Sequence, residues 1–357
     1  MNEEIKLRVN GVDFGGWKEV EIVAGLERQA RDFTFGVTQR WPGATDIPRR
    51  IKQGDLCEVL LGKDKLLTGY VDATPISYSG KSITVGVKGR SKTADLVDCS
   101  AVYKTGQWTK AKIEQIATDL VKPFKDMKVI VNAPTGDAMI NFRLNPGETA
   151  FEAIDRMLTQ RQMLATDDAD GNVVFVKIGA GGRAVTMLEY GKNILTADAA
   201  LDYKDVFSSY VVKGQASAYD ENDAETSSSA SSSITYAGVL RYRALVIVQS
   251  GQVTIQACSD RARFERAHRA AKALETTYTV NGWRQADGAI WLPNQLVRVI
   301  DPVIGYDGEM LIVEVALRKN DSGMTTTMKV GPKAGYVLDA KNEKGQKDPW
   351  PDARSAK

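Results

Sequence analysis

The 357-residue chain contains a single histidine, His268, and only three cysteines, Cys57, Cys99 and Cys258. One imidazole cannot build a multi-histidine metal centre, and it leaves a His-based catalytic triad no choice of partner. The cysteines are too few and too far apart in the sequence for a disulfide framework or a zinc site. We therefore expect neither a bound metal nor a cofactor.

Long apolar runs are also missing. No stretch approaches the ~20 apolar residues that a membrane-spanning helix needs. The N-terminus, MNEEIKLRVN, lacks the apolar core of a signal peptide. We therefore expect a soluble protein that is made in a cytoplasm and does not insert into a membrane.

The chain has no excess of charge of one sign. Its 47 basic and 45 acidic residues give a net charge of +2. Proteins that hold nucleic acid through a positive field usually carry a strong basic excess. The balance therefore argues against such a binder.

Catalytic motifs are absent as well. No Gly-x-Ser-x-Gly elbow occurs, and no cysteine has a histidine candidate near it in the sequence. His268 lies among several cationic residues, which disfavour its protonated form and make it a poor general base. Carboxylates are plentiful, so composition leaves a two-carboxylate glycosidase open, but the spacing nominates no pair. We assign no catalytic residue and predict that the chain is not an enzyme.

Two short segments superficially resemble ligand sites. Residues 167–171 (DDADG) resemble a calcium loop, but its twelfth position, which requires a bidentate Glu, would be Lys177. The segment is better interpreted as a hairpin turn. Residues 179–182 (GAGG) precede no Lys-Ser/Thr pair and open no helix, so they predict a flexible domain junction rather than a phosphate cradle.

Residues 1–94 have the alternation of short β-strands. Ile5, Leu7 and Val9 alternate with polar residues before Asn10-Gly11, a strong turn signal. Short strands punctuated by Gly and Pro predict a small barrel or sandwich. The further strands are expected at residues 33–37, 56–61, 66–71 and 83–87.

Residues 95–180 predict a small α/β domain. Apolar residues from Trp108 to Leu120 lie close to helical spacing, and Pro123 stops that run. Thr149 and Glu152 form a capping-box pair at the start of a second helix that ends near Leu164. Strands are expected at residues 128–131 and 173–178.

Residues 181–335 predict a second β region that carries a loop and a helix. Residues 216–233 are rich in Ser, Asp and Glu and predict a mobile loop or the tip of an extended hairpin. An inserted helix is expected over residues 260–278, with Ser259 as its cap and with an apolar stripe that includes Phe264 and Tyr278. Strands are expected at residues 203–213, 241–249, 296–300, 310–317 and 325–330.

The polar residues 336–357 predict a flexible tail. The predicted fold class is mainly β with α+β parts, in which two β regions flank an α/β domain and a long helix.

Several stretches resemble the baseplate hub proteins of contractile-tailed phages. Residues 54–59 (GDLCEV) and 67–71 (LTGYV) resemble the first barrel of that family. Residues 87–100 (VKGRSKTADLVDCS) are the most specific piece and resemble a passage of the Mu-like phage tail protein P group.

The resemblance continues through the rest of the chain and covers roughly residues 1–335. Residues 145–164 and 170–172 resemble the central α/β domain of the family. Residues 291–302 and 323–332 resemble the end of its second barrel.

The resemblance implies that the two β regions, residues 1–94 and 181–335, are two similar small β-barrels. It further implies a homotrimer in which each chain contributes these two barrels, so that six barrels form a ring around a channel. Such hubs are related to those of T-even phages and to the N-terminal region of VgrG proteins. Such a hub adapts the hexameric tail tube to a trimeric membrane-piercing spike and contacts other baseplate proteins. DNA passes through its channel without specific binding. The resemblance places the protein in the virion tail, assembled in the host cytoplasm, and it assigns no interface residue.

Two other functions stay open at this point. One is a receptor- or glycan-binding tail module, for which β-rich folds and exposed tryptophans are common. The other is a tail-associated peptidoglycan hydrolase that acts through an unrecognised carboxylate pair.

Overall fold

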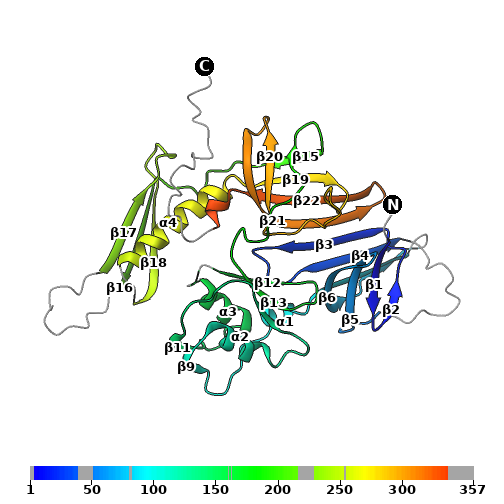
Figure 1. Ribbon diagram of the computed structural model, residues 1–357, viewed down its shortest axis with the longest axis horizontal. Helices are drawn as coiled ribbons and strands as arrows, with labels where there is room; N and C mark the ends of the chain where they lie inside the picture. The colour runs from blue at the N-terminus through cyan, green and yellow to red at the C-terminus, as the bar shows by residue number, and fades with distance from the viewer. Residues whose placement is uncertain are drawn as a thin grey trace. The chain divides into compact units, whose positions relative to one another are not determined.

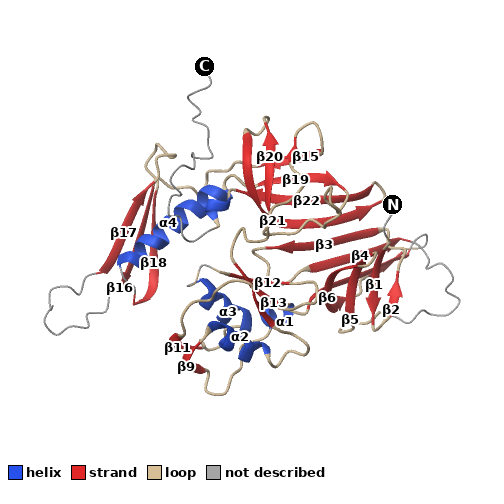
Figure 2. Ribbon diagram, viewed as in Figure 1, coloured by secondary structure: helices blue, strands red, loops and turns tan. Residues whose placement is uncertain are grey.

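The computed structural model describes residues 4–38, 51–79, 83–159, 161, 163–215, 229–252 and 255–336. Within these residues the chain forms 22 strands and four α-helices (Figure 1). The α-helices are α1–α3 and a longer helix, α4, and the remaining regular structure is strand apart from one 3-10 turn at Lys333–Gly335 (Figure 2). The predicted class, mainly β with α+β parts and one long helix, is confirmed.

The chain divides into two compact units, each built from separate stretches of sequence. Unit 1 comprises Met1–Val185, Thr279–Gln295 and Ile312–Met328. Unit 2 comprises Thr186–Tyr278, Leu296–Leu311 and Lys329–Lys357. The strands β19 (Thr276–Asn281), β21 (Tyr306–Asn320) and β22 (Gly323–Gly331) contribute residues to both units.

A long sheet dominates unit 1, in the strand order β19-β22-β21-β3-β4-β8-β6-β5-β1-β2, with β7 paired to β8. Its N-terminal strands follow the predicted alternation, since Ile5, Leu7 and Val9 are buried and the residues between them are partly exposed. Asn10 and Gly11 both have positive φ, as the predicted tight turn requires. The strands are β1 (Ile5–Val9), β2 (Val12–Phe14), β3 (Glu19–Gly25), β4 (Asp32–Thr38), β5 (Leu56–Leu61), β6 (Asp64–Ala73), β7 (Ile76–Tyr78) and β8 (Ile83–Ser91).

The predicted barrels are not closed. In a closed barrel the first and last strands of the sheet pair with each other. Among the described residues, β2 pairs only with β1, and β7 pairs only with β8. The sheet of unit 1 is therefore open at β2 and at β7.

An α/β layer completes unit 1. A three-stranded sheet in the order β10-β13-β12 packs through Val173 and Phe175 against helices α2 and α3. The predicted capping box is present: the Glu152 carboxylate accepts from the Thr149 N–H at 2.7 Å, and the Thr149 hydroxyl accepts from the Glu152 N–H at 3.1 Å. The elements are α1 (Ala94–Asp98), β9 (Gln107–Ala111), α2 (Ile113–Val121), β10 (Val129–Val131), β11 (Met139–Arg143), α3 (Ala150–Thr159), β12 (Leu164–Asp167) and β13 (Val173–Val176).

Two predicted boundaries in this layer are wrong. Trp108 lies on β9, where it stacks on Tyr103 and hydrogen-bonds Asp119 of α2, so the helix starts only at Ile113. The second helix ends at Thr159 and not near Leu164, because Leu164 begins β12. In both cases a neighbouring strand takes apolar residues that helical spacing had assigned to the helix.

Unit 2 contains β14 (Leu188–Glu189), β15 (Ile194–Ala199) and β20 (Leu296–Asp301), together with parts of β19, β21 and β22. Polar side chains are satisfied inside it. The hydroxyl of Tyr278 donates to Asp301 at 3.0 Å, and the hydroxyl of Tyr306 donates to the Leu274 carbonyl at 2.6 Å. Burial raises the pKa of both hydroxyls, so they remain protonated donors at neutral pH.

A second sheet of unit 2 has the order β17-β16-β18, formed by β16 (Ser209–Gln215), β17 (Ser229–Thr235) and β18 (Ala244–Gln252). Helix α4 (Ile255–Lys272) packs on β16 and β17 (Figure 1). Its buried residues Cys258 and Ala262 contact Tyr210 and Val212 of β16. One face of this sheet is thereby covered.

The predictions for this region need two corrections. The helix runs over Ile255–Lys272 and not over residues 260–278, so Ser259 lies inside it and Tyr278 lies on β19. The Ser-rich segment is not a loop from Ser229 onward, because backbone pairing with β16 makes that part a strand despite its small side chains. Residues 216–228 and 337–357, predicted as a loop or hairpin tip and as a tail, lie outside the described residues. Tyr336, the first residue assigned to the tail, is buried.

Candidate functional site

The described part of the chain holds no cluster of three or more His, Cys, Asp or Glu side chains that could bind a metal ion. None of its helices is long and apolar enough to span a bilayer. Cys57 and Cys258 are buried, and burial raises the pKa of the Cys57 thiol to about 12, so it is not a thiolate nucleophile at neutral pH. His268 is a packing residue: its ring stacks on Phe264, and its Nδ1 lies 2.9 Å from the Gly335 carbonyl.

The segments that resembled ligand sites have structural roles. Residues 167–171 form the turn of the β12–β13 hairpin, as predicted. The Asp168 carboxylate accepts hydrogen bonds from the N–H groups of Asp170 and Asn172 at 2.9 and 2.8 Å. The 179–182 segment is held in place, because Asn294 accepts from the N–H groups of Gly179 and Gly181. It is therefore not a free linker.

A cleft of about 620 Å³ lies within unit 1, between the β10–β13–β12 sheet, the start of β6 and the loop that precedes β20. Its three carboxylates are all engaged in contacts with other residues. Asp64 pairs with Arg284 at 2.6 Å, Asp167 pairs with Arg31 at 3.0 Å, and Asp168 caps its own turn. No free pair of carboxylates faces this cleft, so its geometry does not favour the glycosidase alternative.

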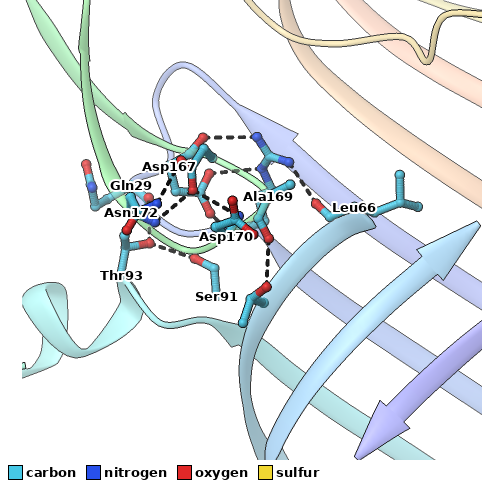
Figure 3. Close-up of polar contacts among 11 residues, drawn as sticks. Gln29, Leu66, Ser91, Thr93, Asp167, Ala169, Asp170 and Asn172 are labelled. Atoms are coloured by element: carbon cyan, nitrogen blue, oxygen red, sulfur yellow. Dashed lines mark hydrogen bonds and ion pairs between the residues drawn. The ribbon is translucent and has the colours of Figure 1, made fainter. Parts of the chain in front are cut away.

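A buried polar junction, formed by Arg31, Asp167 and their neighbours, ties the long sheet of unit 1 to its α/β layer (Figure 3). The Nε and backbone N–H of Arg31 donate to the Asp167 carboxylate at 3.0 and 3.1 Å. Its terminal nitrogens donate to the carbonyls of Leu66 and Asp167 at 2.7 and 3.0 Å. Burial raises the pKa of the Asp167 carboxyl, and the Arg31 cation offsets part of that shift.

The same junction is closed from the other side by the β12–β13 turn. The Thr68 hydroxyl donates to the Ala169 carbonyl at 2.8 Å, and the Lys65 ammonium contacts Asp170 at 2.9 Å. The Thr93 hydroxyl lies 2.6 Å from that of Ser91 and donates to the Gln29 carbonyl at 3.1 Å (Figure 3). These contacts connect segments that are far apart in the sequence.

The passage 87–100, the most specific part of the resemblance, forms the end of β8 and helix α1. Arg90 bonds to Asp72 at 2.7 Å and to both oxygens of Asp98 at 3.1 and 2.7 Å. The bond from Arg90 lowers the pKa of Asp98. Lys92 is buried and donates to the Asp126 carbonyl at 2.6 Å. The motif residues therefore hold the two layers of unit 1 together and do not form a reactive site.

The described surface offers contact areas of another kind, namely open strand edges with exposed apolar side chains. On the β7–β8 hairpin, Ile76 and Tyr78 are 62% and 81% exposed. On β18, Val246 and Val248 are 55% and 79% exposed. Unprotected edges of this kind are available for pairing with another strand.

Exposed tryptophans would have favoured the glycan-binding alternative. Trp17, Trp108, Trp283 and Trp291 are all buried. The remaining tryptophans, Trp41 and Trp350, lie outside the described residues. The described surface therefore has no tryptophan platform for a sugar ring.

Neither the Arg31–Asp167 pair nor the exposed strand edges were identified from the sequence. The pair joins residues 136 positions apart, and no local spacing signals such a contact. The β18 edge did have a signal: the run ALVIV at residues 244–248 has no polar alternation although it lies at the edge of a sheet.

Three family models match successive parts of the chain. Residues 4–91 match the N-terminal domain of the Mu phage baseplate assembly protein GpP-like family. Residues 93–177 match the second domain of the baseplate hub protein gp44-like family, and residues 254–339 match the fourth domain of the Mu phage baseplate assembly protein GpP.

Individual relatives agree with the family models. The chain is 34% identical to the baseplate hub protein gp44 of Escherichia phage Mu, over 97% of its own length and 93% of that protein. It is also 34% identical to the 43 kDa tail protein of prophage MuSo2 from Shewanella oneidensis, whose crystal structure matches with a TM-score of 0.85 over 94% of this chain and 100% of that one.

A more distant structure shares the fold alone. The E. coli c3393 protein, a component of the type VI secretion system described as similar to the T4 tail proteins gp27 and gp5, is 11% identical. It matches with a TM-score of 0.55 over 93% of this chain and 78% of that one. The identity to the Mu protein over nearly the whole chain and the three family models show that the chain belongs to the Mu-like family of phage baseplate hub proteins, which are structural components of the virion tail and not enzymes.

Proposed function

We propose that the protein acts as a homotrimeric ring with a central channel, and that this ring adapts the hexameric tail tube to the trimeric spike of the baseplate. The observation that carries the proposal is the open sheet of unit 1. Among the described residues, strand β7 pairs only with β8, and its residues Ile76 and Tyr78 are exposed. It contains no charged residue that would protect this edge. An isolated chain with such an edge tends to associate, and pairing between subunits removes the edge.

The channel of the proposed ring carries no strong electrostatic field. A net charge of +2 on 357 residues provides no strong field that would retain DNA in the channel. We propose that DNA passes without specific binding and that the hub assembles in the host cytoplasm with its tube, spike and other baseplate partners. The name of the Mu relative supports the placement in a baseplate.

The same proposal includes a division of labour along the chain. Residues 1–94 and 181–335 form the ring-building β parts, and residues 95–180 form the α/β layer that braces the first of them. The family-model spans 4–91 and 93–177 support the first two boundaries. Tyr336 is buried, so the tail that takes no part in ring closure is proposed for residues 337–357.

Light scattering on a sizing column, over a series of protein concentrations, tests the ring. One chain has a mass of 39.0 kDa, so three chains give about 117 kDa. We expect the 117 kDa species to grow with concentration. A dimer would contradict the proposal, and so would a monomer that persists at all concentrations even after purified tube or spike protein is added.

A further inference from the structure

The β17-β16-β18 sheet of unit 2 has two open edges and one bare face. Helix α4 covers the face formed by Tyr210 and Val212, so the opposite face has no described cover. The bare face of β18 presents Ala244, Val246 and Val248, all exposed. β17 and β18 each pair with β16 on one side. Among the described residues, no backbone-to-backbone hydrogen bond is made on their other side.

Neither edge carries the charged residues or prolines that normally prevent pairing. Soluble proteins protect their edge strands with charged residues, proline or bulges that turn the edge away. β17 (SASSSIT) and β18 (ALVIVQSGQ) together contain no charged residue and no proline, and the one register shift between β16 and β18 lies beyond Gln249, after the exposed valines. In a chain with 26% charged residues, two uncharged edges on one sheet indicate that both are covered in the working protein.

We propose that β18 of one copy pairs with β17 of the next copy, so that this sheet continues from subunit to subunit around the trimer. This rests on the proposed homotrimer and assigns one of its contacts. A single head-to-tail contact satisfies both edges in every copy, whereas a strand from an unrelated protein on β18 would leave β17 open. The seven residues of β17 fit within the nine of β18.

Strand direction and symmetry agree with this pairing. β17 runs antiparallel to β16 and β18 runs parallel to it, so β18 of one copy meets β17 of a similarly oriented copy in antiparallel fashion. Contacts between two different surfaces build rings, whereas pairing of β18 with β18 would be isologous and stop at a dimer. The exposed row of Ser231 and Ser233 then lies beside the exposed valines of the neighbouring copy.

The first test places lysine on the edge. We would compare wild type with a Val246→Lys/Val248→Lys variant by concentration-dependent light scattering. The matched control is Leu240→Lys/Val303→Lys, which adds the same two charges at exposed apolar residues outside any strand. We expect the edge variant to need at least ~10-fold more protein for half-assembly, and the control to assemble as wild type does.

A second measurement covers the case in which the edge variant folds poorly. Hydrogen exchange of the wild-type chain is compared between dilute and concentrated samples. We expect amides of β17 and β18 to gain protection together in the concentrated sample, while those of the central β16 are protected in both. Two results would overturn this pairing if the wild type is trimeric. One is an edge variant that is also trimeric, and the other is a lack of protection at β17 and β18 in the concentrated sample. Either result would leave the proposed ring intact. A wild type that never assembles would overturn both.

Discussion

The Arg31–Asp167 pair is the most deeply buried ion pair among the described residues, with side chains 14% and 3% exposed. Its removal from one side is therefore costly, since a buried carboxylate without its cation costs about 3–5 kcal/mol. We expect Arg31→Met to lower the free energy of unfolding of unit 1 by that order, measured by urea unfolding. Arg31 also donates to two carbonyls that would lose their donors, which adds to the effect.

Arg28→Met is the matched control for this variant. Arg28 belongs to the same loop and pairs with Asp32 and Glu314, but its side chain is 44% exposed. Solvent screens such pairs, so a loss of less than about 1 kcal/mol is expected. Equal losses for the two variants would show that burial of the pair is not what stabilises the junction.

Asp155 on α3 gives a pH-dependent prediction. Burial raises the pKa of its carboxyl above the ordinary value of 3.8, so the folded chain holds this proton to higher pH than the unfolded chain does. Stability from this group is therefore full below pH 3.8 and is lost as the pH rises through the raised pKa. We expect Asp155→Asn to be more stable than wild type at pH 7. Urea unfolding at a series of pH values should show this difference in the free energy of unfolding disappear below pH 3.8.

Asp98 provides the opposite sign. The bond from Arg90 lowers its pKa, so its contribution is present above the ordinary value and is lost as the pH falls through the lowered one. Asp98→Asn should lose a small amount of stability at pH 7, because this side chain is half exposed. If both variants shifted stability in the same direction at pH 7, the assigned causes would be incorrect.

At the scale of elements, the β12–β13 turn depends on Gly171. Its φ is +72°, and an added Cβ would lie 2.7 Å from Lys92 Cε and 2.8 Å from the Thr68 carbonyl oxygen. We expect Gly171→Ala to destabilise unit 1 by about 2–4 kcal/mol in urea unfolding, from left-handed strain together with the clash. Gly147 has φ of +84° and open space around it, so Gly147→Ala should cost only the strain, about 1–2 kcal/mol. If both variants lost a similar amount of stability, the clash of the added Cβ with Lys92 and Thr68 would not be a cause of destabilisation at Gly171.

The elements that the sequence predicted correctly are those with local causes. The alternation at Ile5, Leu7 and Val9 and the Thr149–Glu152 capping box both act within a few residues, and both are present. The errors occurred where the conformation of a segment depends on pairing with residues far away in the sequence. β17 is a strand because β16 pairs with its backbone, which a run of serines does not reveal. The same reason hid the Arg31–Asp167 pair.

For the whole molecule, the order of the chain is not the order of the fold. Residues 279–295 and 312–328 belong to unit 1, although they follow most of unit 2 in the sequence. Trp283, which donates to the Arg318 carbonyl at 2.9 Å, and Glu314, which binds Arg28, belong to these returning stretches. A division into consecutive segments, drawn from hydrophobic patterns alone, cannot capture such a return. It also couples the stability of unit 1 to residues near the end of the described chain.

The salt dependence of assembly is the prediction that belongs to this scale. Uncharged strand edges and a net charge of +2 leave little Coulomb attraction between copies. Between 0.1 M and 1 M salt the Debye length falls from about 10 Å to about 3 Å, which weakens exposed ion pairs but not backbone pairing or apolar contacts. We expect the concentration of half-assembly in NaCl to change by less than roughly twofold over that range, measured by light scattering. A rise of tenfold or more would instead assign the contact to ion pairs, because only those lose their strength as the salt screens them.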